Sequence, residues 1–356
     1  MALIELINAL PEELYNITLV LLDSDNEYAY RLKKNANVVQ LTFNSSFAKS
    51  LVSMYAFPAK VLKKLSVNSF IPYYDFISNC VTNVFEKTYD IAIDFYGYGS
   101  FVTAFLATKI QAKKKATWLH DEKPYWMKSV QKYLCEYDKI YGVSQAVVDA
   151  FCREYPHYKD KAAVFYNVID IEEIKRKSEQ DEIIPFKESF NIVTVGRLTE
   201  QKGYDIAIKA ASILKKRKIN FAWYAIGGGR DEKKLKKLVE KYCLENQFVF
   251  LGRKKNPYPY MKHCDLYVQP SRHEGYVITL VEARALCLPI LSSDIPSARE
   301  QIQDGINGYV AELSAEDLAD KIEYLYNNPS QRKKTVEYLK EHSIDFSTEL
   351  LKLEII

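Results

Sequence analysis

The sequence lacks the features that define membrane, secreted and zinc-binding proteins. It contains no apolar run of about 18 residues, the length that a membrane-spanning helix needs, and no stretch at its start resembles a secretory signal. Its 6 cysteines are scattered, with no Cys-x-x-Cys pair and no Cys/His cluster, so we predict neither a disulfide framework nor a metal site. We therefore expect a cytoplasmic protein of a reducing compartment.

The balance of charge is ordinary. A net charge of +3 gives no overall case for nucleic-acid binding, although basic residues gather at 113–115, 215–218 and 233–237. We interpret these runs as solvated helix faces. The alternative is a peripheral contact with anionic lipid at the inner face of a membrane. A mixture of aromatic and basic side chains in the first half is a further hint of such membrane contact, although a buried helix face explains it equally well. These residues are Tyr125, Trp126, Lys128, Lys132 and Tyr133.

The chain has 356 residues, which suits two cores better than one. Short apolar runs alternate with helical patterns, and near-continuous apolar strands are typical of parallel sheets covered on both faces. The predicted strands are residues 17–22, 38–43, 90–95, 116–119, 139–143, 162–168, 191–195, 221–226, 248–251, 265–268, 289–291 and 308–310. Between two of them, Leu235, Leu238, Val239 and Tyr242 share one face of a helix over 231–244.

We expect two doubly wound α/β domains with a site at the carboxyl ends of their strands. The predicted parts are a first domain at 1–170, a polar linker at 171–187, a second domain at 188–340, and a C-terminal helix at 341–356 that packs back on the first domain.

Two glycine-containing turns follow strands of the second domain. After 191–195 come Gly196, Arg197 and Lys202, and two cations near a helix start suit a diphosphate; two ordinary surface cations are the alternative. After 221–226 comes the triple glycine 227–229, which allows a backbone to approach a ligand closely. Its spacing matches neither a dinucleotide fingerprint nor a Walker loop, and a sharp turn explains it equally well.

Residues 273–285 read HEGYVITLVEARA, with Glu274 in a loop and Glu282 inside a helix that starts near Val277 or Ile278. The free amides of that helix start are suited to phosphate, and a carboxylate accepts hydrogen bonds from vicinal hydroxyls. The plainer alternative makes Glu274 a capping anion and Glu282 a surface residue.

These motifs, in this order, resemble family 4 retaining glycosyltransferases (glycosyl transferases group 1) of the surface polysaccharide type. The matching elements are Gly196-Arg197 with Lys202-Gly203, the turn 227–229, Gly252, Glu274-Gly275 with Glu282-Ala283, and Asp304-Gly305 with Asn307-Gly308. The resemblance is strong over about 140–330. It implies the GT-B fold, in which two Rossmann-like domains face a cleft.

The resemblance also implies roles for individual residues. Arg197 and Lys202 would neutralise the donor diphosphate, while Glu274 would contact the transferred sugar and Glu282 the ribose. In the first domain His120 would lie near the transferred sugar, with a cleft-edge structural histidine as the alternative. The other implied donor-binding residues are Gly196, Gly228, Gly252, Arg253, Gly275, Tyr276, Val277, Ile278 and Thr279, and the expected cleft-lining residues are Ser144 and Asn167.

The start of the chain departs from the family pattern. Residues 1–10 already read as the first helix, and 17–22 matches the family's second strand. We therefore expect the first strand and its glycine-rich loop to be missing from the first domain.

The function implied is metal-independent transfer of a sugar from a nucleotide sugar, with UDP the common nucleotide, to a saccharide or lipid-linked acceptor in capsule or exopolysaccharide biosynthesis. No cofactor beyond this co-substrate is expected. The missing strand raises an alternative, a catalytically impaired nucleotide-sugar-binding protein or partner subunit. A metal-dependent single-domain transferase using Asp23 and Asp25 is a weaker alternative, and the absent fingerprint disfavours a dehydrogenase.

Overall fold

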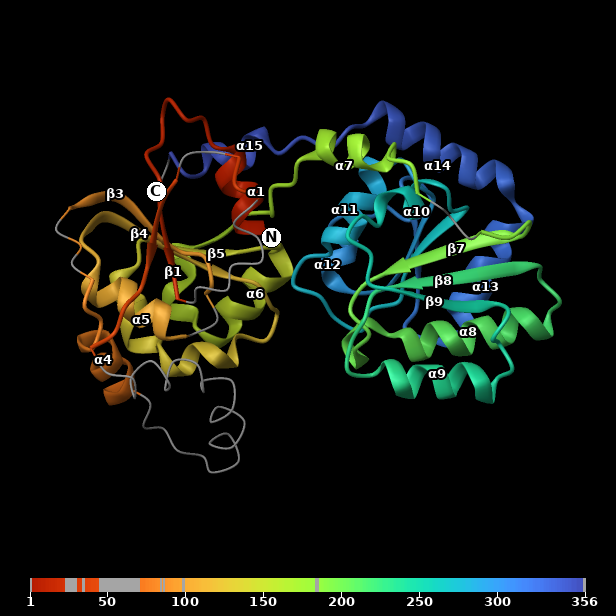
Figure 1. Cartoon of the computed structure of the whole chain (residues 1–356), viewed down its shortest axis with the longest axis horizontal. Coiled ribbons are helices and arrows are strands. Elements are labelled where there is room, and N and C mark those ends of the chain that lie inside the picture. The colour runs from red at the N-terminus through yellow and green to blue at the C-terminus, as the bar shows by residue number, and fades with distance from the viewer. Residues whose placement is uncertain are drawn as a thin grey trace. The chain divides into compact units, whose positions relative to one another are not determined.

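All 12 apolar runs predicted as strands are strands in the computed structural model of the chain (Figure 1). The structure describes residues 2–22, 31–33, 36–44, 71–83, 85, 87–97, 100–182 and 186–354. Its internal contacts divide it into two units: Met1–Ile169 together with Phe346–Ile356, and Asp170–Asp345. Asp23 and Asp25 lie outside the described residues. No described helix combines the length and the apolar character that crossing a bilayer requires.

The second unit is built on one six-stranded parallel sheet with the order β12-β11-β10-β7-β8-β9. Its strands are β7 (Phe190–Val195), β8 (Phe221–Ile226), β9 (Phe248–Gly252), β10 (Leu266–Gln269), β11 (Ile290–Ser293) and β12 (Tyr309–Ala311). The chain adds β8 and β9 on one side of β7, then returns to add β10 to β12 on the other side. The carboxyl ends of β7 and β10 therefore flank the point where the winding direction reverses, the usual place for a ligand in such sheets.

Helices cover both faces of this sheet, which is why its strands are apolar throughout. Neighbouring residues of β7 show the alternation: Ile192 belongs to one buried cluster and Val193 to the other. The first cluster lies under α8 (Tyr204–Lys216), α9 (Glu232–Lys241) and α13 (Ala315–Asn327); α8 and α9 lie together on that side in Figure 1. The second lies under α10 (Tyr258–Lys262), α11 (Ile278–Ala285) and α12 (Pro296–Arg299).

The first unit carries two separate parallel ladders. One joins β1 (Thr18–Leu21) to β2 (Asn37–Gln40), and the other has the order β3-β4-β5-β6. These strands are β3 (Tyr89–Asp94), β4 (Ala112–Leu119), β5 (Lys139–Gly142) and β6 (Ala162–Val164), with the helices α1 (Ala2–Ala9), α4 (Ile71–Asn79), α5 (Phe101–Lys109) and α6 (Gln145–Glu154). In the second unit the first strand, β7, lies in the middle of the sheet, and a strand in the same place here would lie between β1 and β3. Among the described residues no strand joins the two ladders in this way.

Two internal segments differ from the sequence-based prediction, as does the C-terminal segment described in the next paragraph. The stretch 171–187, predicted as a polar linker, contains α7 (Ile171–Ser178), whose Ile174 is buried and which packs on α10 and α11. Residues 113–115, interpreted as a helix face, lie in β4, where Lys113 and Lys114 form exposed ion pairs with Asp90 and Asp138. Periodicity misses such cases, because a short polar segment carries too few apolar residues to reveal its period.

The C-terminal residues contain a short helix instead of one continuous helix over 341–356. Helix α14 (Pro329–Glu341) ends at the start of that range, and α15 (Ser347–Leu351) follows. Within the first unit, the Glu349 carboxylate accepts a hydrogen bond from the Tyr166 amide at 2.9 Å, and the Lys352 ammonium donates to the Val164 carbonyl at 3.0 Å. These bonds tie the end of the chain to the segment after β6.

Asp94 joins three elements of the first unit. It ends β3, is completely buried, and accepts hydrogen bonds from the Gly97 amide at 3.1 Å, the Thr103 hydroxyl of α5 at 2.6 Å and the Thr117 hydroxyl of β4 at 3.0 Å. Burial raises the pKa of the Asp94 carboxyl, and these hydrogen bonds oppose the rise. The carboxylate is acceptor-only, so it satisfies donors from β4, α5 and the turn after β3 together.

We expect Asp94→Asn to destabilise the first unit by about 1–3 kcal/mol, because the new amide group directs N–H donors at hydroxyls that already donate. Urea-induced unfolding measures this difference. Asp90→Asn, at an exposed position of the same strand, is the matched control and should leave the free energy of unfolding nearly unchanged. Equal effects of the two substitutions would contradict the role given to Asp94.

Candidate active site

Two loops of the second unit meet where the sheet's winding reverses. The loop after β7 runs through Gly196 to Gly203, and the loop after β10 begins at Pro270. Gly203 has a φ of +66°, and a Cβ placed there would lie 1.8 Å from the Pro270 carbonyl oxygen. Only glycine allows this approach, so the two loops are held backbone to backbone.

The predicted glycine turn packs on the first of these loops. Gly227 has a φ of +151°, and a Cβ on it would lie 1.8 Å from the Gly196 carbonyl oxygen. Its amide donates to the Gly252 carbonyl at 2.9 Å, and the Arg253 side chain lies against Gly228. The predicted donor-binding loops after β7, β8, β9 and β10 are thus brought together within one unit.

Glu274 is held by one of its two carboxylate oxygens. The residue as a whole is only 7% exposed, and Oε1 accepts hydrogen bonds from the Lys202 ammonium at 2.6 Å and the Ser271 hydroxyl at 2.7 Å. Oε2 has no hydrogen-bond partner in the part of the chain that the structure describes. The carboxylate is therefore fixed in orientation while one oxygen keeps its capacity to accept hydrogen bonds from a ligand.

The two predicted diphosphate cations are in different situations. Lys202 is committed to Glu274 in an ion pair whose side chains are 14% and 9% exposed. Arg197 is exposed, and its guanidinium has no partner among the residues that the structure describes. Arg197 is therefore the cation whose donors are available to an anion at this loop, and Lys202 balances the charge of Glu274.

Helix α11 begins at Ile278, as the sequence predicts, and its N-cap residue Val277 supplies no side-chain cap. Two of its first amides already have partners, since Ile278 donates to the Tyr276 carbonyl and Leu280 to the Val277 carbonyl, both at 3.1 Å. This end therefore offers an anion the Thr279 amide and the positive end of the helix dipole. Glu282, inside α11, is 8% exposed, and its Oε1 accepts a hydrogen bond from the Tyr258 hydroxyl at 3.0 Å. Gly275 and Tyr276 lie in the loop between Glu274 and this helix.

The predicted residues of the first unit have contacts within that unit. His120 follows β4, and its Nε2 lies 2.6 Å from the Phe95 carbonyl oxygen; since that oxygen only accepts, Nε2 carries the proton. Burial lowers the pKa of His120, and the bond to Phe95 opposes this effect. Ser144 is fully buried and its hydroxyl accepts from the Val147 amide at 3.2 Å, so helix capping accounts for it. Asn167 is buried as well.

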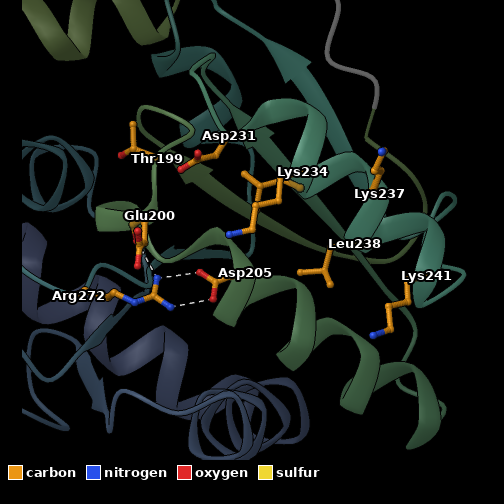
Figure 2. A pocket seen from close by; sticks show the side chains of 10 residues that line it. Thr199, Glu200, Asp205, Asp231, Lys234, Lys237, Leu238, Lys241 and Arg272 are labelled. Carbon is orange, nitrogen blue, oxygen red and sulfur yellow. Dashed lines mark hydrogen bonds and ion pairs between the residues drawn. The ribbon is translucent and has the colours of Figure 1, made fainter.

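A pocket of about 240 Å³ lies beside these loops, but other residues than the predicted site residues line it (Figure 2). Lysines of α9 line one side, and opposite them Arg272 forms a two-bonded ion pair with Asp205, both distances being 2.7 Å. The hydrogen bonds from Arg272, together with its charge, lower the pKa of the Asp205 carboxyl. None of the predicted site residues lines this pocket. The Arg272–Asp205 pair instead anchors the Glu274 loop to the start of α8.

Sequence reasoning missed the polar residues that support Glu274. Ser271 donates to its carboxylate, Ser297 donates to its backbone carbonyl at 2.9 Å, and Gln269 donates to Ser271 at 2.7 Å. One signal was available: Gln269 is a long polar residue at the end of the apolar strand β10, where burial demands a hydrogen-bond partner. The serines carry no comparable signal, because serine is common in turns.

Comparison with known proteins identifies the second unit. Residues 175–342 match the family model described as Glycosyl transferases group 1. An uncharacterized glycosyltransferase of Methanocaldococcus jannaschii is 33% identical over 172 residues, covering 47% of this chain and 40% of that protein. The Campylobacter jejuni N-acetylgalactosamine-N,N'-diacetylbacillosaminyl-diphospho-undecaprenol 4-alpha-N-acetylgalactosaminyltransferase is 32% identical over 157 residues, covering 44% of this chain and 41% of that protein. The matched regions span about half or less of these relatives.

Solved structures extend the likeness to the whole fold. A glycosyltransferase from Rickettsia africae has a TM-score of 0.73 at 17% identity, covering 99% of this chain and 93% of that one. Anabaena HepE in complex with UDP also has a TM-score of 0.73 at 17% identity, covering 99% and 94%. Residues 175–342 of this chain are therefore similar to the glycosyl transferases group 1 domain, in a chain with the GT-B fold of two Rossmann-like domains.

Proposed function

We propose that the chain is a retaining glycosyltransferase that moves a sugar from a UDP-sugar to a saccharide or lipid-linked acceptor in polysaccharide biosynthesis. The observation that carries the proposal is the asymmetry at Glu274, whose Oε1 is held by Lys202 and Ser271 while Oε2 has no partner within the described residues. An oriented carboxylate at the point where the sheet's winding reverses can accept hydrogen bonds from sugar hydroxyls.

The surroundings of Glu274 supply the charge that this reaction needs. Transfer releases a nucleoside diphosphate, and its negative charge grows as the glycosidic bond breaks. The exposed Arg197, the Thr279 amide and the positive dipole end of α11 would stabilise that charge where it develops, without a metal ion. Glu282, one turn into α11, would accept from the ribose hydroxyls. Gly228 and Arg253 would contact the base of the donor nucleotide.

Relatives support the choice of donor and acceptor class. Solved structures with this fold include Anabaena HepE in complex with UDP-glucose and the Staphylococcus aureus protein TarM in complex with UDP. The Campylobacter jejuni relative is named for transfer to a diphospho-undecaprenol-linked saccharide, and another relative is an amylovoran biosynthesis glycosyltransferase of Erwinia amylovora. We infer the same classes here, with peripheral contact at the inner membrane face as part of the proposal.

The second candidate function is nucleotide-sugar binding without transfer, as an impaired enzyme or a partner subunit. We consider this candidate because the first unit has two separate ladders. A continuous sheet would hold the loops of this unit, which is assigned to the acceptor, more firmly. Binding of UDP with no turnover of any UDP-, GDP- or ADP-sugar would favour this candidate over the enzyme.

We expect Glu274→Gln to lower the rate of UDP-sugar hydrolysis and transfer by about 100-fold or more, because the substitution removes the charge that Lys202 and the sugar hydroxyls share. UDP affinity should change little, since the nucleotide half of the site is made by other loops. Enzyme-coupled detection of released UDP and calorimetric UDP titration measure the two quantities.

Glu240→Gln, which removes an exposed carboxylate of α9, is the matched control and should retain wild-type rates. Unchanged turnover in the Glu274→Gln variant would contradict the proposed site, independently of the result for the control variant. The configuration of the anomeric carbon in the product, read by NMR, tests retention separately, and an excess of chelator tests metal independence.

The proposal gives His120 the role of a neutral hydrogen-bonding group near the transferred sugar. Because burial lowers the pKa of His120, the imidazole stays neutral as pH falls to its usual pKa of about 6.5 and becomes charged only at lower pH. We expect kcat/KM to hold through pH 6.5 and to fall on the acid side of it. His120→Gln should keep the Phe95 bond but lose this acid-side fall, with His157→Gln as the exposed control. An identical acid limb in wild type and His120→Gln would rule the role out.

A further inference from the structure

A chain of buried hydrogen bonds leads from the core of the second unit to Glu274. The Tyr267 hydroxyl donates to Oε1 of Gln269 at 2.6 Å, Nε2 of Gln269 donates to the Ser271 hydroxyl at 2.7 Å, and Ser271 donates to Oε1 of Glu274 at 2.7 Å. Tyr267, Gln269 and Ser271 are all 1% exposed or less. Burial keeps bulk solvent from competing for these bonds, so each member fixes the next one.

The direction of every bond in this chain follows from the acceptor at its end. The Glu274 carboxylate only accepts, so the single proton of Ser271 must point at it. Ser271 then has to accept from its other neighbour, and only the amide nitrogen of Gln269 can donate there. The amide oxygen consequently faces Tyr267 and also Thr279, whose hydroxyl donates to it at 2.8 Å. Tyr267 remains a donor, because burial raises its pKa far above the usual range.

Gln269 thereby connects the two halves of the candidate site. Through Ser271 it reaches the carboxylate assigned to the sugar, and through Thr279 it reaches the first turn of α11, assigned to the phosphates. The backbone of the Glu274 loop has separate tethers, since Ser293 and Ser297 donate to the carbonyls of Ser271 and Glu274. The Gln269 side chain therefore bonds to the hydroxyl that holds the carboxylate, while the backbone of the loop is held by other residues.

We propose that Gln269 is a positioning residue for transfer, which turns the Glu274 carboxylate through Ser271 so that Oε1 is satisfied by the protein and Oε2 is presented to the sugar. This inference rests on the proposed function, because it takes Glu274 to contact the transferred sugar. It adds a residue whose substitution should slow the sugar step much more than it weakens nucleotide binding.

The first test uses Gln269→Met, which keeps the length of the side chain and removes its three hydrogen bonds, with Tyr267, Ser271 and Thr279. We expect kcat for UDP-sugar hydrolysis to fall about 10-fold or more, because a carboxylate displaced by about 1 Å loses its alignment, while UDP affinity stays within about twofold. Gln247→Met, at a half-buried glutamine before β9, is the matched control and should change neither quantity. An equal loss of UDP affinity and kcat would indicate a structural role and overturn the proposal.

The second test uses Gln269→Glu and the pH profile. The ionised carboxylate that this substitution introduces cannot donate to Ser271, whereas its protonated form can replace the amide. We expect the activity of this variant, relative to wild type, to recover as pH is lowered. A merely structural role would give a constant ratio at all pH values, and that result would overturn the proposal.

A third variant, Ser271→Ala, tests whether Gln269 acts on Glu274 through Ser271. If Gln269 acts through Ser271, the double variant Gln269→Met/Ser271→Ala should be no slower than the slower single variant; losses that multiply would mean independent action and reject the chain. Failure of the underlying function is recognised separately. A wild-type protein that turns over no nucleotide sugar overturns both proposals, whereas an active wild type with unaffected Gln269 variants overturns only this one.

Discussion

The pairing of β7 with β10 in the second unit's parallel sheet is the constraint on which the candidate site depends. Sheet order 12-11-10-7-8-9 makes these two strands neighbours although about seventy residues separate them along the chain. Their following loops leave the same edge of the sheet, and the two crossovers diverge in opposite directions. Ligands of such sheets bind at this point, and the two loops that leave it are the ones that carry Arg197 and Glu274.

Within that frame, two glycine contacts bring the loops closer than side chains would permit. Gly203 meets the Pro270 carbonyl and Gly227 meets the Gly196 carbonyl, each at a position where a Cβ would overlap an oxygen. The loops that carry the predicted donor-binding residues are therefore packed backbone against backbone, and their positions are fixed before any ligand binds.

The electrostatics of the site divide two cations between two tasks. Lys202 neutralises Glu274 in a nearly buried ion pair, where an uncompensated charge would cost several kcal/mol. Arg197 remains exposed and without a partner in the described part of the chain. The motif spacing alone makes the two cations equivalent. Only the geometry separates a residue that orients the carboxylate from one that is available to phosphate.

The first unit uses a buried carboxylate differently. All donors to Asp94 come from its own unit and both of its oxygens are occupied, so it acts as a structural acceptor. Glu274 keeps one oxygen available, and that difference in occupancy distinguishes a supporting carboxylate from a candidate ligand-binding one.

The sequence by itself determined the twelve strands, the helical cover, the start of α11 near Val277 or Ile278 and the loops that carry the glycines and charges. Each of these is a local property, readable from apolar periodicity and from motifs within about fifteen residues. What only the tertiary structure decided is long-range: the Lys202–Glu274 pair, the orientation of the hydrogen-bond chain through Gln269, and the hydrogen bond from the Tyr166 amide to Glu349. Such partners are set by strand register and loop closure, which no local pattern records, because a side chain's hydrogen-bond partner depends on where distant backbone is placed.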